Sequence, residues 1–107
     1  MINRVIISGV LVDEPLEYVV SKEKEYLSYC DAKIVTQDYK KDKLKRIKVR
    51  LYYKMAQDFI ANQIVYKENL CMYYGEVFYV EKDDITFVKI TETPQVLARL
   101  DDYEWTK

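Results

Sequence analysis

Charge and apolar bulk alternate with a period of two across residues 46–53, which run Arg-Ile-Lys-Val-Arg-Leu-Tyr-Tyr. This period predicts a β-strand with one face toward a core and the other toward solvent. The predicted inner face holds Ile47, Val49, Leu51 and Tyr53. The predicted outer face holds Arg46, Lys48, Arg50 and Tyr52. A row of cations that ends in an aromatic ring is a surface suited to a nucleic-acid strand.

Positive charge is concentrated around this strand. Residues 33–54 hold nine Lys or Arg and two Asp, although the whole chain carries a net charge of −1. A basic band on an acidic body can hold a polyanion in one groove and repel it elsewhere. A solvated strand face is the plain alternative, and Tyr52 together with the upstream cations favours a binding role. The candidate contacts just before the strand are Lys40, Lys41, Lys43 and Lys45.

The composition argues against several classes of site. The chain has no His and no Cys-x-x-Cys pair, which disfavours a zinc site and catalysis by imidazole. The acidic pairs at residues 83–84 and 101–102 have no evident third ligand or base. We therefore expect no catalytic residues, no metal site and no cofactor. Cys30 and Cys71 are predicted to be buried free thiols, with a disulfide as the open alternative.

The remaining apolar patterns predict four more strands and one helix. The strands cover residues 3–12, 26–36, 70–80 and 85–91, and helical spacing occupies residues 54–65. Residues 37–45 are predicted to be a connection, residues 81–84 a tight hairpin, and residues 95–107 a helical or loose tail. This order predicts an all-β fold with one helix, a five-stranded OB-fold Greek-key barrel with the helix between strands 3 and 4. We expect one domain at residues 1–97 and a short acidic-aromatic tail at residues 98–107.

Several segments match a known family in order and spacing. Residues 1–11 begin MINRVIISGVL, and an acid-proline turn follows at Asp13-Glu14-Pro15-Leu16. Residues 35–40 end a strand with polar residues and an aromatic, and residues 49–56 run from a strand into the helix. Residues 70–77, LCMYYGEV, carry an internal glycine. On these segments the chain resembles the bacterial and phage single-stranded DNA-binding proteins of the OB-fold type, as a compact member without their long tail.

The resemblance implies which side chains contact DNA. Tyr52 falls where the family has a ring that stacks on a base, and Tyr39 falls near a second such ring. Arg46 falls where many members have an aromatic residue, so a cation replaces stacking there. Lys82 lies near another aromatic position, in a hairpin shorter than the family's usual one.

Strand 70–80 has two apolar faces, so its periodicity alone does not say which face is buried. The resemblance implies that Tyr73 and Val77 point toward the core. It implies that Met72, Tyr74 and Phe78 point outward. Tyr74 and Phe78 are therefore candidate nucleic-acid contacts.

The N-terminus lacks the pattern of an export signal, so we expect a cytoplasmic protein. The resemblance implies a non-catalytic protein that binds single-stranded DNA with little sequence preference in replication or recombination. It also implies a homo-oligomer, a dimer or tetramer joined through the first strand, and the compact form points to a phage or other mobile element. The alternative is an OB-fold accessory factor of a helicase, primase or primosome, with secondary DNA binding. RNA binding is a third, less favoured option. No stretch approaches the roughly 20 apolar residues that cross a bilayer, so we expect no membrane partner.

Overall fold

The structure, a computed structural model, describes residues 3–38 and 43–100. Its strands are β1 (Val5–Leu11), β2 (Tyr18–Val19), β3 (Tyr29–Asp38), β4 (Lys43–Tyr52), β5 (Asn69–Val80), β6 (Ile85–Ile90) and β7 (Gln95–Arg99). Its helices are α1 (Tyr53–Ala61) and α2 (Gln63–Glu68), with 3-10 turns η1 (Glu25–Leu27) and η2 (Glu81–Asp83). None of the helices in these two ranges is long and apolar enough to cross a membrane.

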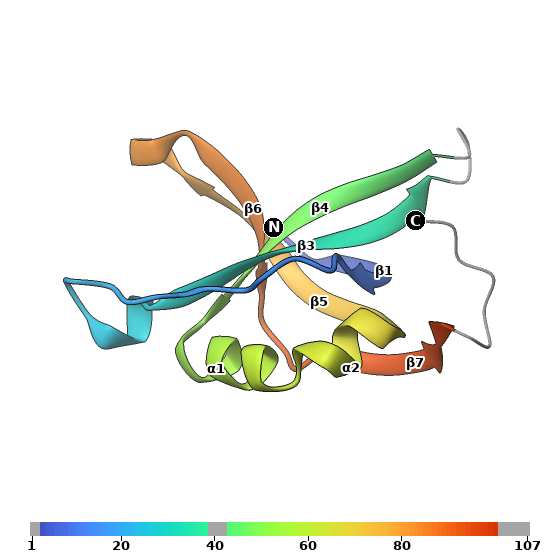
Figure 1. The fold of residues 1–107 in the computed structure, drawn as a ribbon. Helices are drawn as coiled ribbons and strands as arrows, with labels where there is room; N and C mark the ends of the chain where they lie inside the picture. The colour runs from blue at the N-terminus through green and yellow to red at the C-terminus, as the bar shows by residue number, and fades with distance from the viewer. Residues whose placement is uncertain (1–2, 39–42, 101–107) are drawn as a thin grey trace.

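Five strands close into a barrel. They are hydrogen-bonded in the order β1-β3-β4-β6-β5, and β1 pairs again with β5 to complete the ring. The β4–β6 pair is parallel and the other pairs of the ring are antiparallel. The helical segment between β4 and β5 lies across one end of the barrel, and the β3–β4 and β5–β6 hairpins extend from the other end (Figure 1). The predicted OB fold, with its helix between the third and fourth barrel strands, is confirmed.

The barrel interior is filled by alternate residues of its strands. Leu11, Ile34, Leu51 and Tyr73 are fully buried there. Phe59 of α1 stacks on Tyr66 of α2, with 4.5 Å between ring centres, and these two rings close the end of the barrel. The interior is therefore a packed core rather than a ligand cavity.

Three element boundaries differ from the sequence-based prediction. β4 begins at Lys43, so a strand replaces the last part of the predicted connection at residues 37–45. The single predicted helix is divided at Asn62, and its second part continues to Glu68. Residues 95–99 form β7, which pairs with β5 beyond Pro94, instead of a helical or loose tail. This pairing is a long-range contact that a local pattern does not reveal, and the division of the chain at residue 97 stays a prediction.

The inward position predicted for Val77 is wrong. The side chain of Tyr73 is fully buried, whereas Val77 is 46% exposed. From Gly75 onward β5 pairs with β6, while β1 pairs with β5 only as far as Gly75. The Asn3 side chain then covers the backbone of Val77, with Nδ2 donating to its carbonyl at 2.8 Å and Oδ1 accepting from its amide at 3.1 Å. Val77 is exposed because this half of the strand extends beyond the barrel.

Cys30 and Cys71 are buried and outside any disulfide, as predicted. Burial raises the pKa of each thiol to about 11, and the nearby Asp31 carboxylate contributes at Cys30. At pH 8 about one thiol in a thousand is then ionised, and the thiolate is the reactive form. We expect a thiol reagent to label the folded protein only as fast as the protein opens. The denatured protein should label at once, and equal rates in the two states would contradict this prediction.

Candidate nucleic-acid interface

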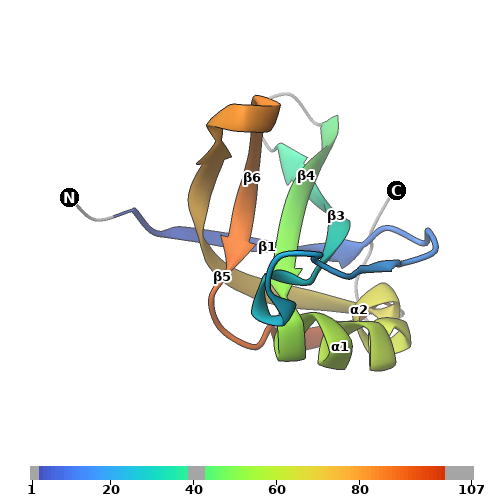
Figure 2. The same cartoon turned by 90° about the vertical axis from the view of Figure 1, so that its left-hand side faces the viewer.

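One outward face runs across four adjacent strands, β3, β4, β6 and β5, which lie side by side in Figure 2. In β4, Val49 and Leu51 are fully buried and their neighbours point outward, so the predicted alternation is confirmed. Tyr53 is half-buried and begins α1 rather than continuing the strand face. The register brings side chains from all four strands together. We call this set the basic face: Tyr29, Asp31, Lys33, Arg46, Lys48, Arg50, Tyr52, Phe78, Phe87 and Lys89.

Arg50 is held rigidly in the middle of the basic face. Its Nε and Nη2 donate to the two Asp31 carboxylate oxygens at 2.7 and 3.0 Å. The guanidinium carbon lies 3.9 Å from the ring centre of Tyr29 and 4.3 Å from that of Phe87. Burial alone would lower the pKa of this guanidinium, but the hydrogen bond to Asp31 keeps the pKa above its usual value. With its side chain 12% exposed, Arg50 joins strands more than it attracts a ligand.

Lys89 lies between two aromatic rings. Its Nζ is 5.5 Å from the ring centre of Tyr52 and 5.7 Å from that of Phe78. Phe78 also packs on Phe87, with 5.5 Å between ring centres. In the described part of the chain Lys89 forms no ion pair with a carboxylate. Tyr52, Lys89 and Phe78, from β4, β6 and β5, thus form a ring–cation–ring group at the surface.

Two acids moderate the positive charge of the row on β4. The Glu14 carboxylate lies 3.8 Å from Arg46 and 3.9 Å from Lys33, and Asp31 lies 3.5 Å from Lys48. The side chains of Arg46 and Lys33 are more than half exposed, so their pairs with Glu14 are weak and easily exchanged for another anion. The pair of Asp31 with Arg50 is short and bidentate and is the one that persists.

The structure brings together five of the predicted site residues: Arg46, Lys48, Arg50, Tyr52 and Phe78. The others lie elsewhere. Lys43 and Lys45 are at the start of β4, and Lys82 is in η2 at the tip of the β5–β6 hairpin. Tyr74 points outward on the other half of β5, where its hydroxyl lies 3.1 Å from Gln95 of β7. Tyr39, Lys40 and Lys41 lie outside the described residues.

Sequence reasoning missed Tyr29, Phe87 and Lys89 on this face. A signal for Lys89 existed, because it alternates with the apolar Val88 and Ile90 in the last barrel strand. Tyr29 and Phe87 lie near Arg50 because of the register between strands, and the sequence alone does not predict that register.

Arg50→Lys should lower the free energy of unfolding by about 2 kcal/mol, because Lys cannot make the bidentate contact with Asp31 or lie flat between two rings. Thermal unfolding should then occur roughly 10 °C lower. Arg46→Lys is the matched control, since the Arg46 side chain is 62% exposed and its substitution should leave Tm nearly unchanged. Equal Tm values for the two variants would show that Arg50 does not join the strands.

No family model and no curated protein matches the sequence. Solved structures do match its fold. The single-stranded DNA-binding domain of a Synechococcus sp. protein superposes with a TM-score of 0.66 at 13% identity, over 89% of this chain and 96% of that one. The mitochondrial single-stranded DNA-binding protein Rim1 of S. cerevisiae gives 0.68 at 13% identity, over 91% and 95%.

The dimeric N-terminal domain of PriB from Thermoanaerobacter tencongensis gives a TM-score of 0.65 at 13% identity, over 91% of this chain and 98% of that one. The three matches cover 89%, 91% and 91% of this chain. At these identities the similarity concerns the fold. The chain has the OB fold found in single-stranded DNA-binding proteins.

Proposed function

We propose that this protein binds single-stranded DNA with little sequence preference and without catalysis. The observation that carries the proposal is the ring–cation–ring group of Tyr52, Lys89 and Phe78, placed beside the cations Arg46 and Lys48. Cations neutralise phosphates, and every base has a flat face that can stack on a ring, so this pairing tolerates any sequence. Exposed rings stack on bases that are unpaired, which favours a single strand over a duplex.

The fold supports the same proposal. Solved proteins described as single-stranded DNA-binding superpose on 89% and 91% of this chain, with TM-scores of 0.66 and 0.68. We therefore propose a role in DNA replication or recombination. The phage or mobile-element origin and the cytoplasmic location stay predictions.

We also propose a homo-oligomer, a dimer or tetramer, that forms through β1. Ile6 of β1 is 56% exposed and offers apolar surface that a second chain can cover. A PriB domain of similar fold is dimeric. Sedimentation at micromolar concentration should give the mass of two or four chains, and the mass of a single chain would contradict this.

An accessory factor of a helicase, primase or primosome is the second candidate. The observation that favours it is the pairing of Glu14 and Asp31 with cations of the basic face, which lowers the attraction for phosphates. Under this alternative, pull-down with the protein recovers a helicase or primase, and oligonucleotides bind weakly. RNA remains a candidate ligand because stacking and cations serve it equally, and an RNA oligonucleotide of the same length tests it.

A fluorescently labelled thymidine oligonucleotide, titrated with the protein at several salt concentrations, tests the main proposal. Each phosphate neutralised on a single strand contributes about −0.7 to the slope of log K against log salt. Contacts from Arg46, Lys48 and Lys89 should give a slope of about −2. Arg46→Gln should make the slope less negative by about 0.7. Lys22→Gln is the control, since Lys22 is exposed and lies outside the basic face, and it should leave the slope unchanged. Absent or salt-independent binding would refute the proposed mode.

A further inference from the structure

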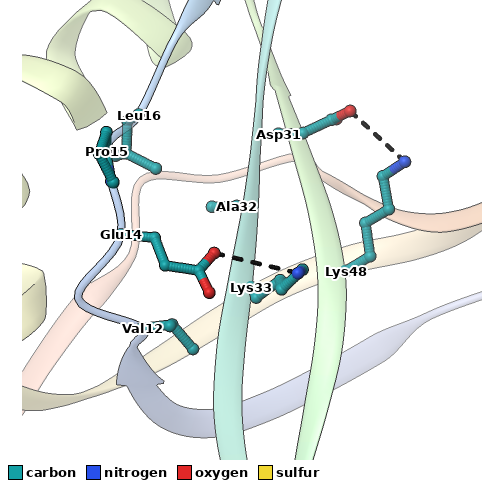
Figure 3. A pocket seen from close by; sticks show the side chains of 8 residues that line it. All are labelled: Val12, Glu14, Pro15, Leu16, Asp31, Ala32, Lys33 and Lys48. Carbon is teal, nitrogen blue, oxygen red and sulfur yellow. Dashed lines mark ion pairs between the residues drawn. The ribbon is translucent and has the colours of Figure 1, made fainter.

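A pocket of about 270 Å³ opens at the edge of the basic face, between β3 and the segment that follows β1. Figure 3 shows the residues around it. Val12, Pro15 and Leu16 supply apolar walls from that segment, and Ala32 lies on the β3 side. Drug-sized ligands occupy pockets of about 300–1,000 Å³, so this smaller space suits a single planar ring system.

A carboxylate and an ammonium group lie side by side in this pocket. Glu14 and Lys33 both line it, and their charged atoms are 3.9 Å apart, as the dashed line in Figure 3 marks. The backbone amide of Glu14 donates to the carbonyl of Val12 at 2.8 Å, which fixes the tight turn that carries the side chain. The pocket thus offers acceptor oxygens and a donor next to each other against an apolar wall.

Within residues 3–38 and 43–100, no side chain donates a hydrogen bond to the Glu14 carboxylate. Its partners in the described residues, Lys33 and Arg46, are 3.9 and 3.8 Å away, beyond hydrogen-bond distance. Asp31 differs, because both of its oxygens accept hydrogen bonds from Arg50. An acid beside a phosphate-binding row repels phosphates, so Glu14 weakens binding unless it contacts some other part of the nucleotide.

We propose that this pocket binds a guanine base of the nucleic-acid strand. The Watson–Crick edge of guanine presents N1–H and N2–H donors side by side, which match the two oxygens of Glu14. Its O6 acceptor is adjacent and matches the ammonium group of Lys33. Thymine presents carbonyls on both sides of its single N–H, and these oppose a carboxylate. Cytosine and adenine each offer one amino group beside an acceptor, so they match the pocket less well than guanine and better than thymine.

Lys48 links the pocket to the path of the strand. It lines the pocket and also belongs to the cation row of β4. A phosphate held by Lys48 places the attached nucleotide at the pocket mouth, where an unstacked base can enter. The inference rests on the proposed function and adds a guanine preference at one position to binding that is otherwise sequence-tolerant.

The test uses the full chain and short thymidine oligonucleotides with one central position varied as guanine, hypoxanthine or thymine. The guanine oligonucleotide should bind about tenfold more tightly than the all-thymine one, as one good bidentate contact allows. Hypoxanthine keeps N1–H and O6 but lacks the N2 amino group, so its affinity should fall between the two. Competition titration measures all three at one salt concentration.

Glu14→Gln should remove the guanine preference, because the amide presents a donor where guanine also presents a donor. Glu17→Gln is the matched control, since Glu17 is an exposed acid of the same segment that does not line the pocket, and it should keep the preference. Equal affinities of the wild type for guanine and thymine would overturn the inference and leave the proposed function standing. A preference that survives Glu14→Gln would also overturn it. If no oligonucleotide binds at all, the proposed function itself fails.

Discussion

Replacing Tyr52 and Phe78 together with alanine should weaken binding to a thymidine oligonucleotide by about a hundredfold or more. Each base stacked on a ring contributes about 1–3 kcal/mol by alanine substitution, and the double variant removes both rings. The double variant also removes both cation–π contacts of Lys89, whose Nζ lies within 6 Å of both ring centres. Fluorescence anisotropy at constant salt measures the loss.

The matched control is Tyr79→Ala. Tyr79 neighbours Phe78 on β5 and is 54% exposed, but it points to the opposite side of the strand, where its hydroxyl donates to Asp84 at 2.7 Å. Its loss should change affinity less than about threefold, a difference below 1 kcal/mol. Comparable losses for Tyr79→Ala and for the double variant would place the strand somewhere other than the basic face.

Gly75→Ala should produce a large loss of stability, because a methyl group has no room at this position of the barrel. Gly75 pairs with Val5 of β1 on one edge and with Ile90 of β6 on the other. A Cβ at this position would overlap the carbonyl oxygen of Lys89 and lie 2.9 Å from Cγ1 of Val88. The side chain of Val88 can rotate away, but the carbonyl belongs to a paired strand and cannot.

We expect Gly75→Ala to lower the free energy of unfolding by about 3 kcal/mol, at the upper end for overpacking. Small domains are stable by about 5–15 kcal/mol in total, so Tm should fall by more than about 12 °C. Ser8→Ala is the control, since Ser8 is an exposed barrel residue and its substitution should leave Tm almost unchanged. An unchanged Tm for Gly75→Ala would mean that β5 and β6 can move apart at this position without lowering the free energy of unfolding. Because Lys89 belongs to the displaced segment, the variant should also bind DNA more weakly.

The alternation at residues 46–53 predicted the inner and outer faces of β4 correctly, because a half-buried strand imposes its period on its own sequence. The same local logic failed where long-range pairing decides the structure. β7 is formed by hydrogen bonds to β5, and the exposure of Val77 follows from where β1 stops pairing. The resemblance placed Tyr73 inward and Phe78 outward, where periodicity alone left both faces open.

The candidate site was partly predictable for a similar reason. Arg46, Lys48 and Tyr52 share one strand, so their common face is visible in the sequence. The partners that modify them come from other strands and from the turn after β1. Arg50 was expected to contact a phosphate, but its two hydrogen bonds to Asp31 make it a link between strands. The spacing of the two residues in the sequence does not predict this pairing.

Chemical-shift mapping during titration with a thymidine oligonucleotide locates the DNA contact on the folded chain. We expect the largest shifts at Tyr52, Phe78 and Lys89 of the basic face. We expect small shifts at Val96 and Leu97, which are also exposed but lie on β7. Large shifts on β7 with little change at the ring–cation–ring group would contradict the claim that the basic face binds single-stranded DNA.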